Sequence, residues 1–200
     1  MPLNSEASFD CLFLAQRLQR LSASFPAAQL HLFAYLGCLL WLYRQEPLTD
    51  WGYSFVGTEL GAPFSREINS ALKEFLDRGY FLRIEDRYAA TRLAQEQFSD
   101  FDQLTLNDSR RACLAAACAS TAAFSIGIVG SALSNEPELK RAQALPSNRL
   151  LLQDSAQKQL YEQFDGLRKA VGDRGSDLRL PAVVWLTALY RTGEAAAPKI

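Results

Sequence analysis

The 200-residue sequence predicts a mostly α-helical protein with a small β-ribbon. Apolar residues recur at helical spacing in most segments, a two-stranded pattern is confined to residues 80–91, and turn signals separate the segments. An apolar fraction of 48% is ordinary for a globular protein of one core. We expect a domain over residues 1–105, a helical region over 106–192 packed on it, and a flexible tail over 193–200.

The first two predicted helices differ in where their apolar residues lie. Residues 10–21 have one apolar face, and Ser24–Pro26 ends that segment. The next helix starts at Ala27, and over Leu30–Tyr43 it is hydrophobic on nearly every side. A helix of this kind must be enclosed. Either the C-terminal half of the chain covers it, or another chain does.

Residues 65–79 predict an amphipathic helix with clear ends. Ser65 is a good N-cap for a helix over Arg66–Arg78, and Gly79 is a typical residue just beyond a helix C-terminus. The apolar face of this helix consists of Ile68, Ala71, Leu72, Phe75 and Leu76.

A short ribbon follows this helix. Strands are expected around Phe81–Ile84 and Tyr88–Thr91, with a tight turn at Glu85–Arg87. An apolar helix, a turn-rich segment over residues 47–65, an amphipathic helix and a two-stranded ribbon are, in this order, the parts of a winged-helix unit. We therefore expect a winged-helix domain followed by a helical C-terminal half.

The remaining segments alternate between helical patterns and breaks. A helix is expected over Leu93–Phe101, and the uncharged, small-residue stretch Ala112–Leu133 predicts a tightly packed interior helix or helix pair, not a membrane span. Residues 135–148 resemble a linker. Helices are expected over Ser155–Val171 and Pro181–Arg191, and a degenerate second winged helix in this half is left open.

Composition excludes several classes of function. The net charge is −1, so no whole-chain positive field attracts nucleic acid. The first residues lack the basic and apolar regions of a secretory signal. The four cysteines lie in apolar surroundings without a C-x-x-C pair, which indicates reduced core thiols and not a zinc site. They are Cys11, Cys38, Cys113 and Cys118. We expect a cytoplasmic protein without metal, cofactor or membrane segment.

Motifs of an active site are absent from the sequence. The single histidine, His31, lies in the most apolar helix, where a packing or capping role is expected. Gly57 and Gly61 belong to no phosphate-binding pattern. Glu85 and Asp86 fall in the ribbon turn, where carboxylates are usually solvated. We therefore expect no enzymatic activity.

The third helix and the ribbon are the candidate DNA-binding surface. Residues 66–92 contain six basic and five acidic residues, a difference of one positive charge. Useful affinity for DNA at physiological salt requires neutralisation of roughly six phosphates, which this surface cannot provide alone. The candidate DNA contacts are Arg66, Ser70, Lys73, Arg83, Arg87 and Arg92.

Aromatic residues indicate a second kind of partner. They concentrate over residues 41–55 and again near the C-terminus, and such residues are enriched in the centres of protein interfaces as well as in domain cores. With the all-apolar helix, they favour stable docking or oligomerisation over a free monomer. The candidate interface residues are Trp41, Tyr43, Trp51, Tyr53, Phe55 and Trp185.

Three stretches resemble a known group of proteins: Trp51-Gly-Tyr-Ser-Phe55, Glu59-Leu-Gly-Ala-Pro-Phe-Ser65 and the helix that ends at Gly79. They are similar to small prokaryotic winged-helix proteins with a Gly-x-Pro-(Phe/Tyr)-Ser turn before the third helix. They also resemble the middle subunits of ABC-three-component, Lamassu-type antiphage systems, which are comparable to winged-helix accessory subunits of SMC complexes. The resemblance covers roughly residues 10–105 and transfers no functional residue.

The resemblance implies a non-catalytic subunit that docks on an SMC-like or ABC-type ATPase in a prokaryotic defence or DNA-sensing complex. An effector subunit would be a further partner, DNA would be contacted weakly or indirectly, and the ATP site would lie on the ATPase. A second winged helix, which tandem versions carry, is not recognisable. The alternatives are a DNA-binding transcriptional regulator or antitoxin that acts as a homodimer, and a homo-oligomeric scaffold without a DNA role.

Overall fold

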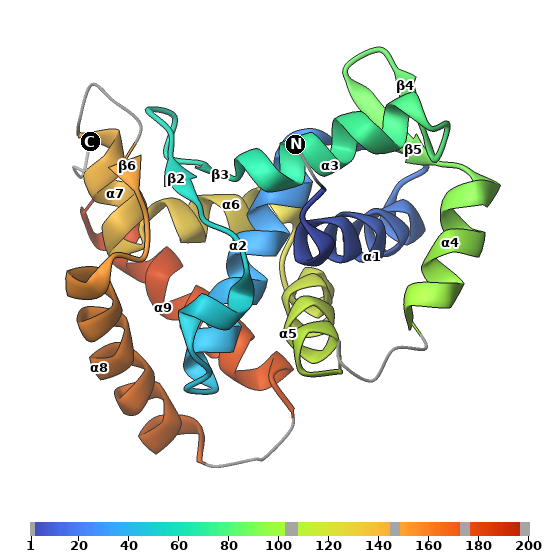
Figure 1. The fold of residues 1–200 in the computed structure, drawn as a ribbon. Helices are drawn as coiled ribbons and strands as arrows, with labels where there is room; N and C mark the ends of the chain where they lie inside the picture. The colour runs from blue at the N-terminus through green and yellow to red at the C-terminus, as the bar shows by residue number, and fades with distance from the viewer. Residues whose placement is uncertain (1–2, 103–107, 145–148, 173–176, 197–200) are drawn as a thin grey trace.

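A computed structural model describes residues 3–102, 108–144, 149–172 and 177–196 of the chain. These residues form a mostly helical fold with two small antiparallel sheets. In Figure 1 one sheet lies at the upper left and the other at the upper right, and most of the helices lie between or below them. The predicted fold class of helices with a small β-ribbon is confirmed in this coarse form.

The N-terminal helices begin where their caps place them. Helix α1 spans Ser5–Leu21, earlier than predicted, because the Asn4 side chain accepts a hydrogen bond from the amide of Ala7 and caps the helix. The short strand β1 (Phe25–Pro26) follows. Helix α2 spans Ala27–Tyr43, in agreement with the sequence.

The chain itself encloses α2. From Leu30 to Tyr43, every side chain except the half-buried Leu32 is buried. Helix α5 (Asp108–Ala119) makes the most extensive contact with α2, and α1 and α8 (Asp154–Val171) also pack on it. Of the two ways to cover this helix, the described fold uses the C-terminal half. Burial of α2 therefore requires no second chain.

The turn-rich segment after α2 contains short regular elements. A 3₁₀ turn η1 (Leu48–Trp51) is followed by strands β2 (Val56–Gly57) and β3 (Pro63–Phe64). Strand β2 lies between β3 and β6 (Arg149–Leu150), so the second sheet joins the two halves of the chain.

The amphipathic helix and the ribbon form as predicted. Helix α3 spans Arg66–Asp77. Strands β4 (Phe81–Ile84) and β5 (Arg87–Ala90) form a hairpin with a two-residue turn. The structure adds a third strand, because β1 pairs with β5 and the sheet order is β1-β5-β4. Strand β4 is therefore an edge strand of this sheet.

The small-residue stretch forms a bent helix pair. Helix α4 (Arg92–Asp102) precedes it, and α5 leads through a 3₁₀ turn η3 (Ser120–Ala122) into α6 (Ile126–Ser134). A helix pair is confirmed, but it is only partly interior: half of the α5 residues are buried, whereas in α6 only Val129, Ala132 and Leu133 are. In the described part of the chain, no single helix has the length and apolar character to cross a membrane; the α5–α6 pair, bent by 113°, meets that test by length and composition only.

One prediction for the C-terminal half is wrong, and one predicted segment starts differently. The linker-like stretch contains helix α7 (Pro137–Gln143), because Glu136 caps its first turn and Leu139 and Ala142 are buried. Helix α9 spans Arg179–Ala196, so the tail expected from Gly193 is helical up to residue 196, and residues 197–200 lie outside the described residues. Proline at the start of a helix is favourable, which a proline-based linker assignment overlooks.

One continuous hydrophobic core includes residues of both halves, from Ala7 to Leu189. The two predicted regions, 1–105 and 106–192, therefore share a core.

All four cysteines are free and buried, as expected of core thiols, and burial raises the pKa of each thiol. The Tyr35 hydroxyl, also buried, donates to Glu136 at 3.2 Å and so ties α2 to the start of α7.

The seating of α7 on β2 can be tested at Gly57. A Cβ at this position would lie 2.4 Å from Cβ of Ala142, so Gly57→Ala should lower the free energy of unfolding by about 1–3 kcal/mol. Gly166→Ala, in the middle of α8 with no heavy atom within 4 Å of the added Cβ, should raise it by up to about 1 kcal/mol. Urea denaturation measures both. A neutral Gly57→Ala would contradict this packing.

Candidate interaction surface

The six aromatic residues predicted as a protein interface lie in the core of the chain. Trp51 and Phe55 are 0% and 2% exposed, Trp41, Tyr43 and Trp185 are also buried, and only Tyr53 is half-buried. They pack against one another and against neighbouring aromatic rings, as in the Trp41–Trp51 contact with ring centroids 5.8 Å apart. These residues leave little surface for a partner, so an interaction surface has to be sought elsewhere.

A buried ionic network fixes the residues around Trp51. The Arg110 guanidinium in α5 donates to the Asp10 carboxylate in α1 at 2.7 Å and to the carbonyl of Trp51 at 2.5 Å. The Tyr53 hydroxyl donates to the second Asp10 oxygen at 2.5 Å, and Arg110 lies 4.0 Å above the Trp51 ring. Burial raises the pKa of Asp10, although the charge of Arg110 opposes this shift. The network joins both halves of the chain at one point.

His31 has the packing role that the sequence predicts. It is 4% exposed, its Nδ1 accepts a hydrogen bond from the backbone amide of Ser65 at 3.2 Å, and its ring lies 4.7 Å from that of Phe64. Burial lowers the pKa of His31 to about 4. The neutral imidazole therefore holds α2 against the start of α3.

Helix α3 presents a surface of mixed charge. Arg66, Ser70 and Lys73 are exposed, and neither Arg66 nor Lys73 forms an ion pair with another described residue. Glu74, on the same helix, pairs with Arg78 at 2.6 Å. Half of the six candidate DNA contacts are thus accessible on α3, among carboxylates that would repel phosphate.

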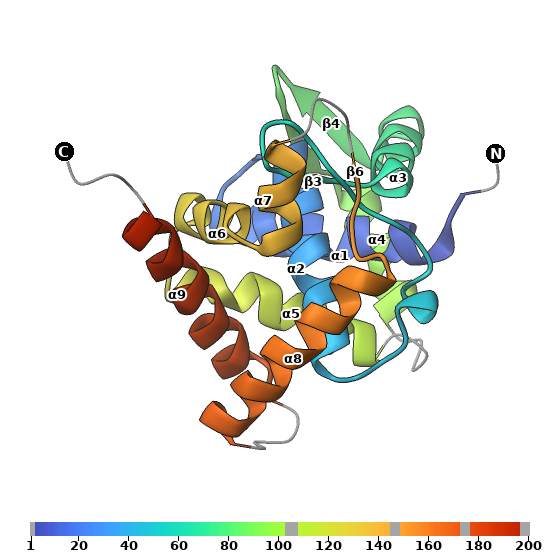
Figure 2. The same ribbon diagram turned by 90° about the vertical axis from the view of Figure 1, so that its left-hand side faces the viewer.

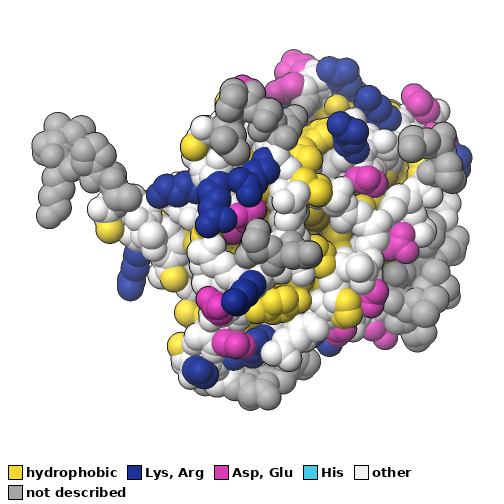
Figure 3. All heavy atoms as spheres, turned by 60° about the vertical axis from the view of Figure 1, so that its left-hand side comes forward, with side chains coloured by type: hydrophobic (Ala, Val, Ile, Leu, Met, Phe, Trp, Pro, Cys, Tyr) yellow, Lys and Arg dark blue, Asp and Glu magenta, His cyan; other side chains and the backbone are white. Residues whose placement is uncertain are grey.

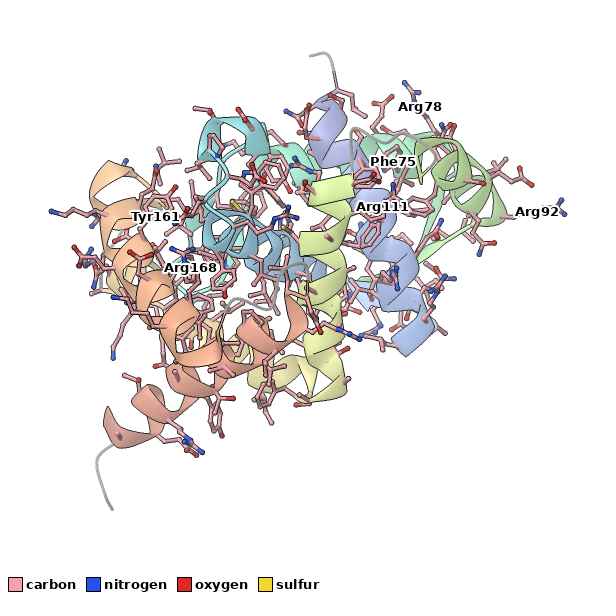
Figure 4. All side chains as sticks on the ribbon, turned by 90° about the horizontal axis from the view of Figure 1, so that it is seen from below. Phe75, Arg78, Arg92, Arg111, Tyr161 and Arg168 are labelled. Atoms are coloured by element: carbon pink, nitrogen blue, oxygen red, sulfur yellow. The ribbon has the colours of Figure 1, made fainter. Side chains whose placement is uncertain are left out.

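The three other candidate DNA contacts, all arginines, make contacts within the chain. Arg87 is half-buried and donates to the hydroxyl and the carbonyl of Ser24, which holds β5 to the segment before β1. Arg83 is exposed and donates to the carbonyl of Glu85 at 2.9 Å. Arg92 pairs with Glu96 at 2.8 Å and points away from the protein at the start of α4 (Figure 4). Of these three, Arg87 has a clear structural role.

The outer face of the hairpin is apolar. Phe81 is 1% exposed and points into the core, whereas Leu82 and Ile84 are 58% and 51% exposed. Side chains alternate along a strand, so Leu82 and Ile84 share the face turned away from the core. On β5, Ala89 is opposite Leu82 and extends this face, and Arg87 is opposite Ile84 at its edge. We call Leu82, Ile84 and Ala89 the wing face.

Sequence reasoning missed the wing face, although the signal was present. Phe81 and Leu82 are consecutive hydrophobic residues in a strand, so they must lie on opposite faces of the sheet. A ribbon with one covered face necessarily exposes one of them. The pattern alone did not indicate which face would be covered.

The rest of the surface carries charges of both signs. Figure 3 shows Lys and Arg side chains interspersed with Asp and Glu on one face, with hydrophobic side chains between them. Within the described ranges, no three His, Cys, Asp or Glu side chains are placed to hold a metal ion together. The wing face differs from this pattern because two large exposed apolar side chains, Leu82 and Ile84, lie on the same face of one strand.

Protonation of His31 should destabilise the fold. Its pKa in the folded state lies below the unfolded value of about 6.5, so its stabilising contribution is present above pH 6.5 and is lost as the pH falls towards 4. Between pH 7 and pH 4.5 the wild type should lose about 2 kcal/mol more than His31→Asn, whose amide oxygen can accept from Ser65 without titrating. The measurement is urea denaturation at the two pH values. If the free energy of unfolding falls by the same amount in the wild type and in His31→Asn, this role of His31 is contradicted.

Removal of Arg110 should strongly destabilise the protein. Arg110→Met leaves Asp10 buried without its partner, which should lower the free energy of unfolding by about 3–5 kcal/mol at pH 8. Loss of the cation raises the folded-state pKa of Asp10 further. A raised pKa makes the fold less stable as pH rises through it, so the deficit should shrink towards pH 4.5.

The control for this substitution is the double variant Asp10→Asn/Arg110→Met. It removes both charges, so it should recover part of the lost stability and lose the extra pH dependence. A single variant that costs less than about 1 kcal/mol would show that the network contributes little.

Comparison with known proteins adds no relative to these observations. No family model matches the chain, and no curated protein or solved structure is similar to it. Functional arguments therefore rest on the residues and the geometry described above.

Proposed function

We propose that this protein is a non-catalytic winged-helix accessory subunit that docks on an SMC- or ABC-type ATPase in a prokaryotic defence or DNA-sensing complex. The docking surface is the wing face, formed by Leu82, Ile84 and Ala89. An effector subunit is a further partner in this proposal, and DNA is contacted weakly or indirectly.

The order of the elements supports the winged-helix part of the proposal. Three helices, α1, α2 and α3, precede the β4–β5 hairpin, and the strand between the first two helices pairs with the second strand of the hairpin. This is the order of helices and strands in a winged helix. One departure is the long α2–α3 connection, residues 44–65, two strands of which pair with β6 or with each other.

The exposed wing face is the observation that carries the docking proposal. Leu82 and Ile84 place large apolar side chains in solvent on an edge strand. Scattered exposed hydrophobic residues are common, but two neighbours on an unpaired sheet edge also carry an aggregation risk that proteins usually reduce with charge. A partner that covers this face removes both the exposed area and the free edge.

The same surface argues against DNA as the main partner. Phosphate binding by a wing depends on free cations, whereas Leu82 and Ile84 present large apolar side chains to solvent and Arg83 and Arg87 already donate hydrogen bonds within the chain. The observation that favours the alternative, a dimeric DNA-binding regulator, is the exposure of Arg66, Ser70 and Lys73 on α3. Arg66 and Lys73 by themselves fall short of the roughly six phosphate contacts needed.

The docking proposal predicts the effect of charge on the wing face. The chain should be captured by the ATPase subunit encoded beside it in its genome, and Leu82→Lys/Ile84→Lys should weaken that capture at least about tenfold, because each lysine would have to be desolvated. The matched control is Leu60→Lys at the β2–β3 turn, where the side chain is 91% exposed. Co-purification and titration calorimetry measure the effect.

Three outcomes would overturn the docking proposal. The first is a genome that encodes no such ATPase beside this chain. The second is that the ATPase captures the double variant as well as it captures the wild type. The third is that Leu60→Lys lowers the affinity for the ATPase as much as the double variant does. Binding of the protein alone to a 30-base-pair duplex, measured by fluorescence anisotropy, should be weak and abolished at physiological salt. Binding that survives this salt and is lost in Lys73→Glu would support the regulator instead.

A further inference from the structure

An apolar groove lies between the last two helices. The end of α8 and the start of α9 come close, and the two helices diverge towards α7, so that they form a V (Figure 2). The groove between them has a volume of about 440 Å³ and is bounded at its wide end by Asn135 and Pro137. This volume is in the range of small-molecule sites, which are typically 300–1,000 Å³.

The glycine in the groove has no structural reason to be glycine. Gly166 lies within α8, its φ is not positive, and no heavy atom lies within 4 Å of a Cβ built on it. Glycine in a helix is about 1 kcal/mol less favourable than alanine. Gly166 therefore makes α8 less stable than alanine would, and no steric contact requires glycine at this position. Its effect, like that of the exposed Ala170, is to keep the α8 wall of the groove open, and the exposed Ala188 does the same on α9.

The polarity of the lining defines what the groove can bind. Among the described residues, no charged side chain lines it, whereas three other cavities include Arg17, Arg20 or Arg78. Trp185 forms part of the wall and is held by an edge-to-face contact with Phe164, with ring centroids 5.5 Å apart. An uncharged, apolar lining favours a neutral occupant because a buried charge would lack a partner.

Gln163 supplies a polar group that can orient an occupant. Gln163 is half-buried in the groove, and its amide forms no hydrogen bond with another described side chain or backbone group. Thr192 and Asn135, the other polar residues near it, already donate to the carbonyls of Ala188 and Ser131. The Gln163 amide can donate two hydrogen bonds and accept two.

We propose that the α8–α9 groove binds a neutral, mostly apolar small molecule whose single polar group faces Gln163. This site is separate from the wing face and does not depend on the proposed docking function. Occupation would cover the exposed parts of Val184 and Leu167 and would brace the open V of the two helices.

A neutral fluorescent probe tests the site directly. N-phenyl-1-naphthylamine should bind the full chain with saturable fluorescence enhancement and should raise the melting temperature. Gly166→Leu places a side chain in the groove and should lower the affinity at least about tenfold. The matched control is Gly127→Leu in α6, where the glycine is also helical and exposed, and its affinity should stay within about twofold of wild type.

The chemical class is tested by competition. Octan-1-ol should displace the probe, whereas octanoate at pH 8 should require at least about tenfold higher concentration because its charge would lack a partner. Gln163→Leu should lower the affinity for octan-1-ol more than it lowers the affinity for the probe. The proposal is overturned by non-saturable enhancement, by equal affinity of the two glycine variants, or by equal competition from octanoate. Circular dichroism of each variant confirms that it remains folded.

Discussion

Helix α2 has hydrophobic side chains around its whole circumference, and the burial of this helix is the constraint on which the rest of the fold depends. Helices α1, α5 and α8 pack around it, and the segment with Trp51 and Phe55 covers a further side. This arrangement brings residues 100 positions apart into contact, as at the Asp10–Arg110 pair. A single core consequently extends through both halves of the chain, and the aromatic residues around α2 are used inside the molecule.

The enclosure of α2 also positions the surfaces that remain free. His31 at its N-terminal end holds the backbone of Ser65, where α3 begins, and Phe75 of α3 packs edge-to-face on Phe81 of the hairpin. The wing face is therefore placed on the side away from the core by a chain of rigid contacts. At the opposite end of the core, Phe164 contacts both Tyr43 of α2 and Trp185 of α9, so the wall of the α8–α9 groove is also fixed to α2.

Local signals in the sequence were sufficient for most elements but not for all of them. Ser65 and Gly79 marked the ends of α3 correctly, because capping and left-handed backbone are properties of single residues. The linker assignment over residues 135–148 was wrong because Pro137 was taken as a break, whereas it stands at the first position of α7. Strand β1 was missed since two residues carry no periodic pattern, and only pairing with β5 defines them.

The candidate surface depended much more on tertiary structure. The sequence by itself determined the mixed charge of α3, the reduced character of the cysteines and the presence of two consecutive hydrophobic residues in β4. It did not determine that Trp51 and Phe55 face inward, that Arg87 is bound to Ser24, or that Leu82 and Ile84 remain exposed. The physical reason is that hydrophobicity and charge are properties of a residue, whereas burial depends on which distant segment covers it, and that is decided only when α5, α8 and α9 pack around α2.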